Sequence, residues 1–108
     1  MSVRDKIHDQ VTGNPVMLYM KGSPAFPQCG FSNAAVQMLK ACGVDRFQSV
    51  DVLSDPEIRQ GIKEYANWPT IPQLYVNGEF VGGADIMREM YQSGELQKVL
   101  EAAKAKAG

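Results

Sequence analysis

The sequence is poor in cysteine: its 108 residues include only two, Cys29 and Cys42. If residues 30–42 form one helix, the two Cα atoms lie roughly 20 Å apart at about 1.5 Å per residue. A disulfide requires Cα atoms closer than about 7 Å. The sequence therefore excludes a bridge within one chain and a disulfide-stabilised secreted fold. Cys29 must act alone or with a thiol from elsewhere.

Charge excess and long apolar runs are also missing. The 11 basic and 12 acidic residues give a formal net charge of -1, so neither nucleic acid nor an anionic membrane is indicated as a partner. No apolar run approaches the roughly 20 residues that span a bilayer. The stretch MSVRDKIHDQ mixes charges and lacks the apolar segment of a signal peptide. We expect one domain over residues 1–108, in a reducing cytoplasm.

Hydrophobic periodicity predicts the order helix, strand, helix, strand, helix, hairpin, helix, helix. The nearly all-apolar run PVMLYM indicates a central strand covered on both faces. A helix between the first two strands implies a right-handed β-α-β crossover, and the hairpin adds antiparallel strands. We therefore expect an α/β fold with a thioredoxin-like outline: a mixed four-stranded sheet with helices on both faces.

Local signals refine these boundaries. Asn77-Gly78 between two strand patterns predicts a tight hairpin. Ser54 lies three residues before Glu57, with Pro56 between them, which is the spacing of a helix-capping box. Asp85 is a candidate N-cap for the helix that follows Gly83.

Cys29 precedes an amphipathic helix, in a loop that contains Pro24 and Pro27. The N–H groups and the positive dipole end of a helix start stabilise thiolate over thiol. Lys21 is a further cation at the end of the first strand. We expect a lowered pKa and a reactive sulfur at Cys29. Cys42 falls on the apolar face of the helix, where an ordinary thiol in the core is expected.

Ser32 occupies the place of the second cysteine in a Cys-x-x-Cys pair. A hydroxyl cannot resolve a mixed disulfide, so efficient two-thiol disulfide chemistry is disfavoured. Two functions remain open at this point: single-thiol exchange with a small thiol, and metal ligation with ligands donated from outside. A binding module without chemistry would leave the features around Cys29 unexplained.

Two further stretches are informative. In WPTIP, residues 68–72, base rates favour a trans peptide bond before Pro72, because only about 5–6% of such bonds are cis. Arg59 and Lys63 are four residues apart on one helix face, where they either hold a carboxylate or are simply solvated.

Taken together, MKGSP, QCGFS, NWPTIPQLYVNGE and VGGADI resemble the monothiol glutaredoxins of the Cys-Gly-Phe-Ser class, in order and spacing, over nearly the whole chain. The resemblance implies a cis peptide bond before Pro72 and a groove for glutathione. In that groove Lys21 and Arg59, with Lys63 beside them, would meet the glycine carboxylate. Ile71 would pair with the backbone of glutathione.

At the other end of the implied groove, Gly83, Ala84 and Asp85 would take the γ-glutamyl group, with Asp85 facing its ammonium. Many members of this class have cysteine just before the aspartate. Ala84 stands there in this chain, so no regulatory disulfide with Cys29 can form at that position.

The class is also associated with [2Fe–2S] cluster carriage, iron homeostasis and BolA-like partner proteins. Such a cluster normally takes four thiolates. One chain offers Cys29, so the resemblance implies a homodimer in which two chains and two glutathiones supply four, and from which apoproteins receive the cluster. The competing hypothesis is enzymatic: a glutathione-dependent oxidoreductase that uses Cys29 to remove glutathione from protein thiols.

Overall fold

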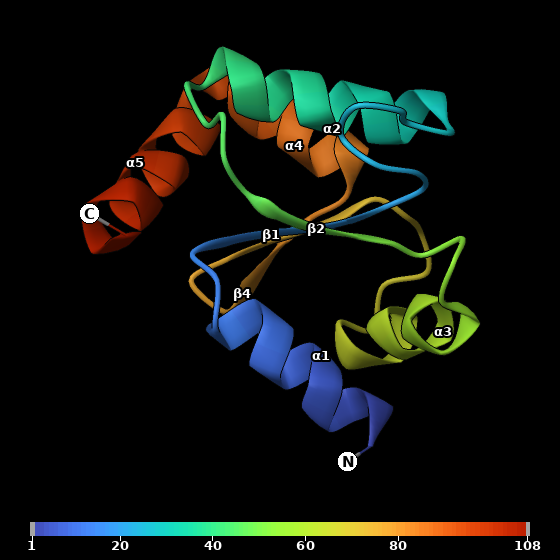
Figure 1. Ribbon diagram of the computed structural model, residues 1–108. Coiled ribbons are helices and arrows are strands. Elements are labelled where there is room, and N and C mark those ends of the chain that lie inside the picture. The colour runs from blue at the N-terminus through green and yellow to red at the C-terminus, as the bar shows by residue number, and fades with distance from the viewer. Residues whose placement is uncertain (1, 108) are drawn as a thin grey trace.

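The computed structural model describes residues 2–107, in which one mixed sheet is enclosed by helices (Figure 1). The strands are β1 (Val16–Met20), β2 (Gln48–Asp51), β3 (Gln73–Val76) and β4 (Glu79–Gly82). Their order is β2-β1-β3-β4, with β1 and β2 parallel and the other neighbours antiparallel. The predicted four-stranded mixed sheet is confirmed.

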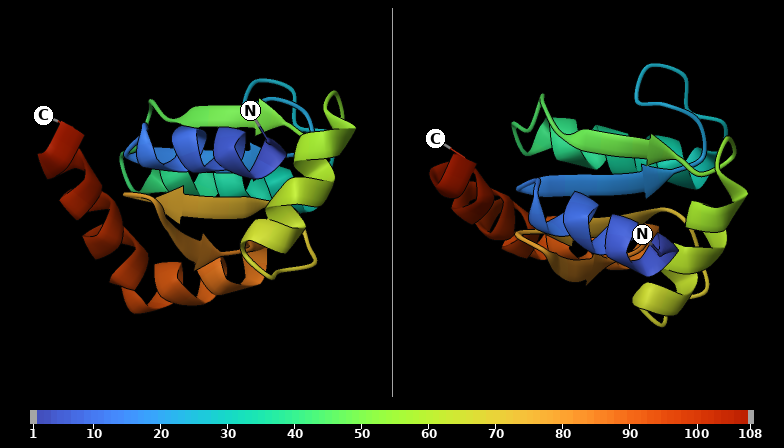
Figure 2. Two further views of the ribbon diagram at one scale, coloured as in Figure 1. Left: turned by 90° about the horizontal axis from the view of Figure 1, so that it is seen from below. Right: turned by 60° about the horizontal axis from the view of Figure 1, so that its bottom comes forward.

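Helices cover both faces of the sheet. The layer formed by α1 (Val3–Thr12) and α3 (Pro56–Tyr65) packs on one face, and α2 (Gly30–Ala41), α4 (Ala84–Ser93) and α5 (Glu95–Ala107) pack on the other (Figure 1). Figure 2 shows α3 and α5 at opposite ends of the sheet. No helix within residues 2–107 is both long enough and apolar enough to cross a membrane.

Strand β1 contributes to two hydrophobic cores. Val16, Leu18 and Met20 pack with α2, α4 and α5, whereas Met17 and Tyr19 pack with α1 and α3. All five side chains are nearly or fully buried. This alternation follows from the period of two along a strand, and it confirms that PVMLYM forms a central strand with both faces covered.

The hairpin forms at the predicted turn. Asn77 and Gly78 have φ angles of 52° and 82°, and Val76 pairs with Glu79 across the turn. Positive φ at both central residues is what a type I′ hairpin turn requires.

Two predicted helix caps are wrong. Asp55, rather than Ser54, is the N-cap of α3, and its Oδ1 accepts a hydrogen bond from the backbone N–H of Ile58 at 3.1 Å. Pro56 takes the first helical position, so the capping residue is the one directly before it. The N-cap of α4 lies two residues earlier than expected, at Gly83, and Asp85 therefore lies in the first turn without a capping hydrogen bond.

The two cysteines are separated as expected. Cys42 is the C-cap of α2, directly before Gly43, which has a φ of 80°. Cys29 lies at the opposite end of the same helix, and both thiols are free. Cys42 is 5% exposed and belongs to the core beside α2.

Candidate functional site

Cys29 is itself the N-cap of α2. Its backbone is extended, with φ -154° and ψ 153°, so that the side chain folds back over the first turn. The backbone N–H of Ser32 donates to Cys29 Sγ at 3.3 Å. Cys29 thus occupies the position in which an N-cap side chain satisfies a helix N–H group that has no partner within the helix. The thiol is only partly buried, so reagents can reach it.

Ser32 is fully buried beside this thiol. Its Oγ accepts a hydrogen bond from the backbone N–H of Lys21 at 3.0 Å and lies 3.6 Å from Cys29 Sγ. A serine hydroxyl has one proton to donate. Because Lys21 N–H already occupies an acceptor position of the oxygen, the hydroxyl proton is available to a Cys29 thiolate. The Ser32 hydroxyl can therefore donate a second hydrogen bond to a Cys29 thiolate, in addition to the one from the Ser32 backbone N–H. The same residue cannot form a disulfide with Cys29.

The two cysteines have opposite pKa shifts. For Cys29, burial raises the pKa, but hydrogen bonds from the backbone and hydroxyl of Ser32 and from the backbone of Phe31, together with the charge of Lys21, lower it below the ordinary value. For Cys42, burial raises the pKa, and the positive charge of Lys104 opposes this only in part. The lowered pKa expected at Cys29 is confirmed. The ordinary pKa expected at Cys42 is wrong, because that thiol is desolvated.

Replacing Ser32 by alanine should raise the pKa of Cys29. The change removes the hydroxyl donor and keeps the backbone N–H. Less thiolate is then present at pH 7, and we expect alkylation to slow by roughly threefold to tenfold, since one pKa unit is a tenfold change in thiolate. Alkylation rate against pH, in a Cys42→Ala background that leaves one thiol, measures this shift. An unchanged pH profile would show that the hydroxyl makes no contribution.

The loop before Cys29 is tightly folded. Lys21 O accepts a hydrogen bond from the backbone N–H of Gln28 at 2.8 Å, which closes the loop onto the end of β1. Gly22 has a φ of 90°, and a Cβ at this residue would lie 2.5 Å from Phe26 O. Only glycine fits both the backbone angle and the close approach. The loop therefore brings Lys21 beside the thiol.

The Ile71–Pro72 peptide bond is cis. The expectation drawn from the family resemblance is confirmed, and the expectation of a trans bond from base rates is wrong. The neighbouring Gln73 is fully buried, and its Nε2 donates to Trp68 O at 3.1 Å and to Thr70 O at 3.3 Å. This side chain braces the loop that leads into the cis bond.

A groove of about 300 Å³ lies next to the Cys29 region. It brings together all seven residues that the resemblance implies for glutathione: Lys21, Arg59, Lys63, Ile71, Gly83, Ala84 and Asp85. The residues that sequence reasoning missed are Phe31, Trp68, Pro69, Thr70 and Pro72. All five lie within motifs already recognised, Phe31 in QCGFS and the other four in NWPTIPQLYVNGE. Cys29 does not line the groove, although Lys21 and Phe31 connect the two.

The charged side chains of the groove come from different elements of the fold. Lys21, Arg59 and Lys63 are half-buried cations, and among the side chains of residues 2–104 the one ion pair joins Lys6 to an aspartate outside the groove. Asp85 is an exposed carboxylate in the first turn of α4. A ligand that carries both carboxylates and an ammonium would be complementary to these charges.

Gly83 allows the groove wall to pack closely. A Cβ at Gly83 would lie 3.1 Å from Trp68 Nε1 and 3.3 Å from Pro72 O. The absence of a side chain thus lets the indole and the cis-proline loop rest against the start of α4.

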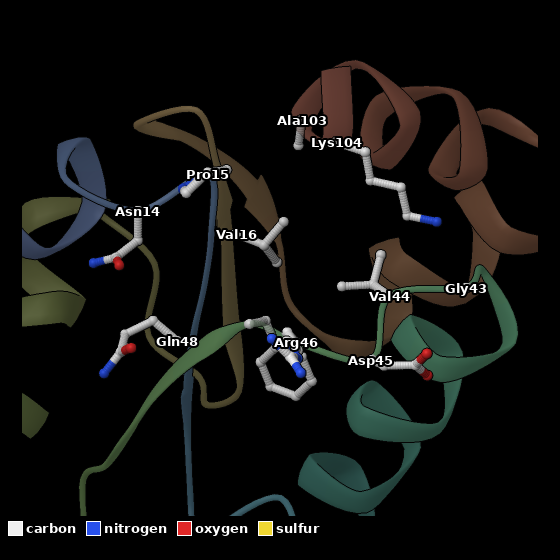
Figure 3. Close-up of a pocket in the computed structure, with 11 residues that line it drawn as sticks. Asn14, Pro15, Val16, Gly43, Val44, Asp45, Arg46, Gln48, Ala103 and Lys104 are labelled. Atoms are coloured by element: carbon white, nitrogen blue, oxygen red, sulfur yellow. The ribbon is translucent and has the colours of Figure 1, made fainter. Parts of the chain in front are cut away.

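A larger hollow of about 540 Å³ lies elsewhere, between β1, β2 and α5 (Figure 3). Its lining includes Val16 at the start of β1, whereas Lys21 of the groove follows the end of β1, so roughly 17 Å of strand separates the two. The residues around the larger hollow include neither cysteine nor histidine. We therefore take the smaller groove as the candidate site, because it lies beside the reactive thiol.

A single chain does not provide a complete metal site. Within residues 2–107, no group of three or more histidine, cysteine, aspartate or glutamate side chains is placed to hold a metal ion. Any metal bound through Cys29 would need ligands from outside the chain.

Comparison with known proteins agrees with this geometry. Residues 16–81 match the glutaredoxin family. An uncharacterised monothiol glutaredoxin of Synechocystis sp. is 64% identical over 100 residues, which is 93% of this chain and 92% of the relative. The solution structure of reduced poplar apo GrxS14 superposes with a TM-score of 0.83 at 50% identity, covering 95% of this chain and 94% of that one.

A buckwheat glutaredoxin, solved as a complex with glutathione, has the same fold with a TM-score of 0.83 at 21% identity, covering 95% of this chain and 91% of that one. The family match extends from β1 almost to the end of β4, and the reactive Cys29 with Ser32 three residues later gives the site a single thiol. The chain belongs to the glutaredoxin family and is similar to its monothiol members.

Proposed function

We propose that this glutaredoxin binds glutathione in the groove beside Cys29. The glycine carboxylate lies against Lys21, Arg59 and Lys63, and the γ-glutamyl ammonium faces Asp85. The support is that three cations, which form no ion pair with the side chains of residues 2–104, and one exposed carboxylate line the same groove. A further support is that a buckwheat glutaredoxin of the same fold was solved as a complex with glutathione.

Bound in this way, glutathione completes a ligand set for a [2Fe–2S] cluster. The observation that carries this proposal is one low-pKa thiol, Cys29, with no other metal-ligand cluster in the part of the chain described. Four thiolates are the usual requirement of such a cluster. Two chains supply two, and two glutathiones supply the others. The holo form is then a homodimer bridged by the cluster.

The same reasoning makes the cluster transferable. Two of its ligands belong to a small molecule that can leave, and the other two belong to chains that can separate. We propose that the protein, acting as one domain in the cytoplasm, delivers the cluster to apoproteins during iron–sulfur biogenesis and iron homeostasis. A BolA-like protein is a proposed alternative partner to the second copy.

The second candidate is monothiol deglutathionylation, favoured by the lowered pKa of Cys29. The thiolate attacks the glutathione sulfur of a mixed disulfide, the protein thiolate leaves, and a Cys29–glutathione disulfide forms. A second glutathione then reduces this disulfide and leaves as oxidised glutathione. Holding glutathione for a cluster and presenting it to a mixed disulfide require different alignments, so we expect this activity to be weak.

Anaerobic reconstitution distinguishes cluster carriage from deglutathionylation. With iron, sulfide and glutathione, the protein should become brown and elute as a dimer. With 2-mercaptoethanol in place of glutathione, which lacks both carboxylates and the ammonium, the colour should be weaker or unstable. A glutathione-coupled reductase assay is run in parallel. Turnover equal to that of a two-thiol glutaredoxin, without any chromophore, would favour the enzyme instead.

A further inference from the structure

Asp51, the last residue of β2, joins two segments of the site through one oxygen atom. Its Oδ1 accepts a hydrogen bond from the backbone N–H of Gly22 at 2.9 Å and another from the backbone N–H of Leu53 at 2.9 Å. Asp51 lies beside Met20 in the parallel pairing of β1 and β2. The carboxylate therefore sits where the two strands end and their following loops diverge.

Each of these loops leads to functional side chains. Gly22 directly follows Lys21, whose backbone N–H holds the Ser32 hydroxyl beside Cys29. Leu53 begins the turn that enters α3, the helix that carries Arg59 and Lys63. One carboxylate oxygen thus connects the thiol side of the site to the cation side.

We propose that Asp51 is a positioning residue that fixes the Lys21 loop relative to the start of α3, and so sets both the hydrogen bonds around Cys29 and the spacing of the cations in the groove. The crowding at Gly22 supports this, because its φ is 90° and a Cβ there would lie 2.5 Å from Phe26 O and 2.7 Å from Gln28 N, so the loop is folded tightly around the residue that Asp51 holds. The part of the inference that concerns the cations rests on the proposed binding of glutathione.

The role follows from hydrogen-bond geometry rather than from charge. A negative charge beside a site for anions opposes ligand binding and disfavours a thiolate nearby. Both hydrogen bonds end on the same oxygen, and the carbonyl oxygen of asparagine also accepts two. Asparagine at position 51 should therefore preserve the positioning role of Asp51, whereas alanine should not.

Asp51→Ala and Asp51→Asn form a matched pair for the test, each in a Cys42→Ala background. Two quantities are measured: the alkylation rate of Cys29 at pH 7 and the Kd for glutathione. With Asp51→Ala we expect the alkylation rate to fall and the Kd to rise, each by about fivefold to tenfold, since two hydrogen bonds are lost. With Asn both should stay within about twofold of the parent protein.

Ser2→Ala is the control for lost stability. Ser2 caps α1 through a hydrogen bond from Asp5 N–H at 3.1 Å, far from the thiol loop in sequence and outside the groove. The loss of this cap lowers the stability of the folded protein. This variant should leave the alkylation rate and the glutathione Kd unchanged, so a fall in either for Asp51→Ala is not explained by destabilisation alone.

The outcomes separate the two proposals. If the parent protein does not bind glutathione, the proposed function fails, and the alkylation rate still tests Asp51. If Asp51→Ala matches the parent, or if Asp51→Asn is as impaired as Asp51→Ala, the inference is overturned. Should Asp51→Ala not fold, amide hydrogen exchange in the parent protein decides: the Gly22 and Leu53 amides should be protected, and exchange at random-coil rates would overturn the assignment.

Discussion

Replacing Cys29 by serine should abolish the cluster and the dimer together. The hydroxyl is a poor ligand for iron, and each chain offers one thiol at this site. Without a protein ligand, nothing holds the glutathione-bound cluster to the two chains. Size-exclusion chromatography of the reconstituted variant, with iron and sulfide analysis, should show a colourless monomer.

Cys42→Ala is the matched control. Cys42 is buried at the far end of α2, and its pKa is raised by burial, so it is not available as a ligand. This variant should keep the chromophore and the dimer. A cluster that survived the loss of Cys29, or vanished with the loss of Cys42, would contradict the ligand assignment.

Neutralising the cations of the groove should weaken glutathione binding. Lys21→Gln and Arg59→Gln each remove a charged hydrogen bond worth about 1.5–3 kcal/mol. Because both side chains are half-exposed, we expect the lower end of that range, about tenfold in Kd for each variant. Isothermal titration calorimetry measures the Kd, and the loss should shrink as salt is raised, because ions screen exposed charges.

Lys40→Gln provides the matched control for net charge. Lys40 is exposed on α2 and does not line the groove. Its replacement should leave the Kd unchanged. An equal rise of the glutathione Kd in all three variants would mean that binding depends only on the overall charge of the protein. That result would contradict specific contacts in the groove.

Most of the fold could be predicted from local sequence. The apolar run of β1 and the Asn77-Gly78 turn each report a local preference, and the corresponding elements form where expected. The cap of α3 was assigned one residue too early, because Ser54 and Asp55 are both good capping residues. The proline that follows Asp55 decides between them.

The site was less predictable because its details depend on long-range contacts. The position of Cys29 at a helix start is a local signal, and Cys29 is the N-cap of α2 as that signal predicts. Two hydrogen bonds, from the Gly22 N–H to Asp51 and from the Lys21 N–H to Ser32, join residues that are distant in sequence. The cis bond before Pro72 opposes the local preference, and the family resemblance was needed to expect it.

Native mass spectrometry of the anaerobically reconstituted protein tests the central claim most directly, because it weighs every ligand of the cluster at once. The account predicts one species with two chains, two glutathiones and one [2Fe–2S] cluster, and an apo protein that is mainly a single chain. A cluster carried by a single chain, or by a dimer without glutathione, would contradict it.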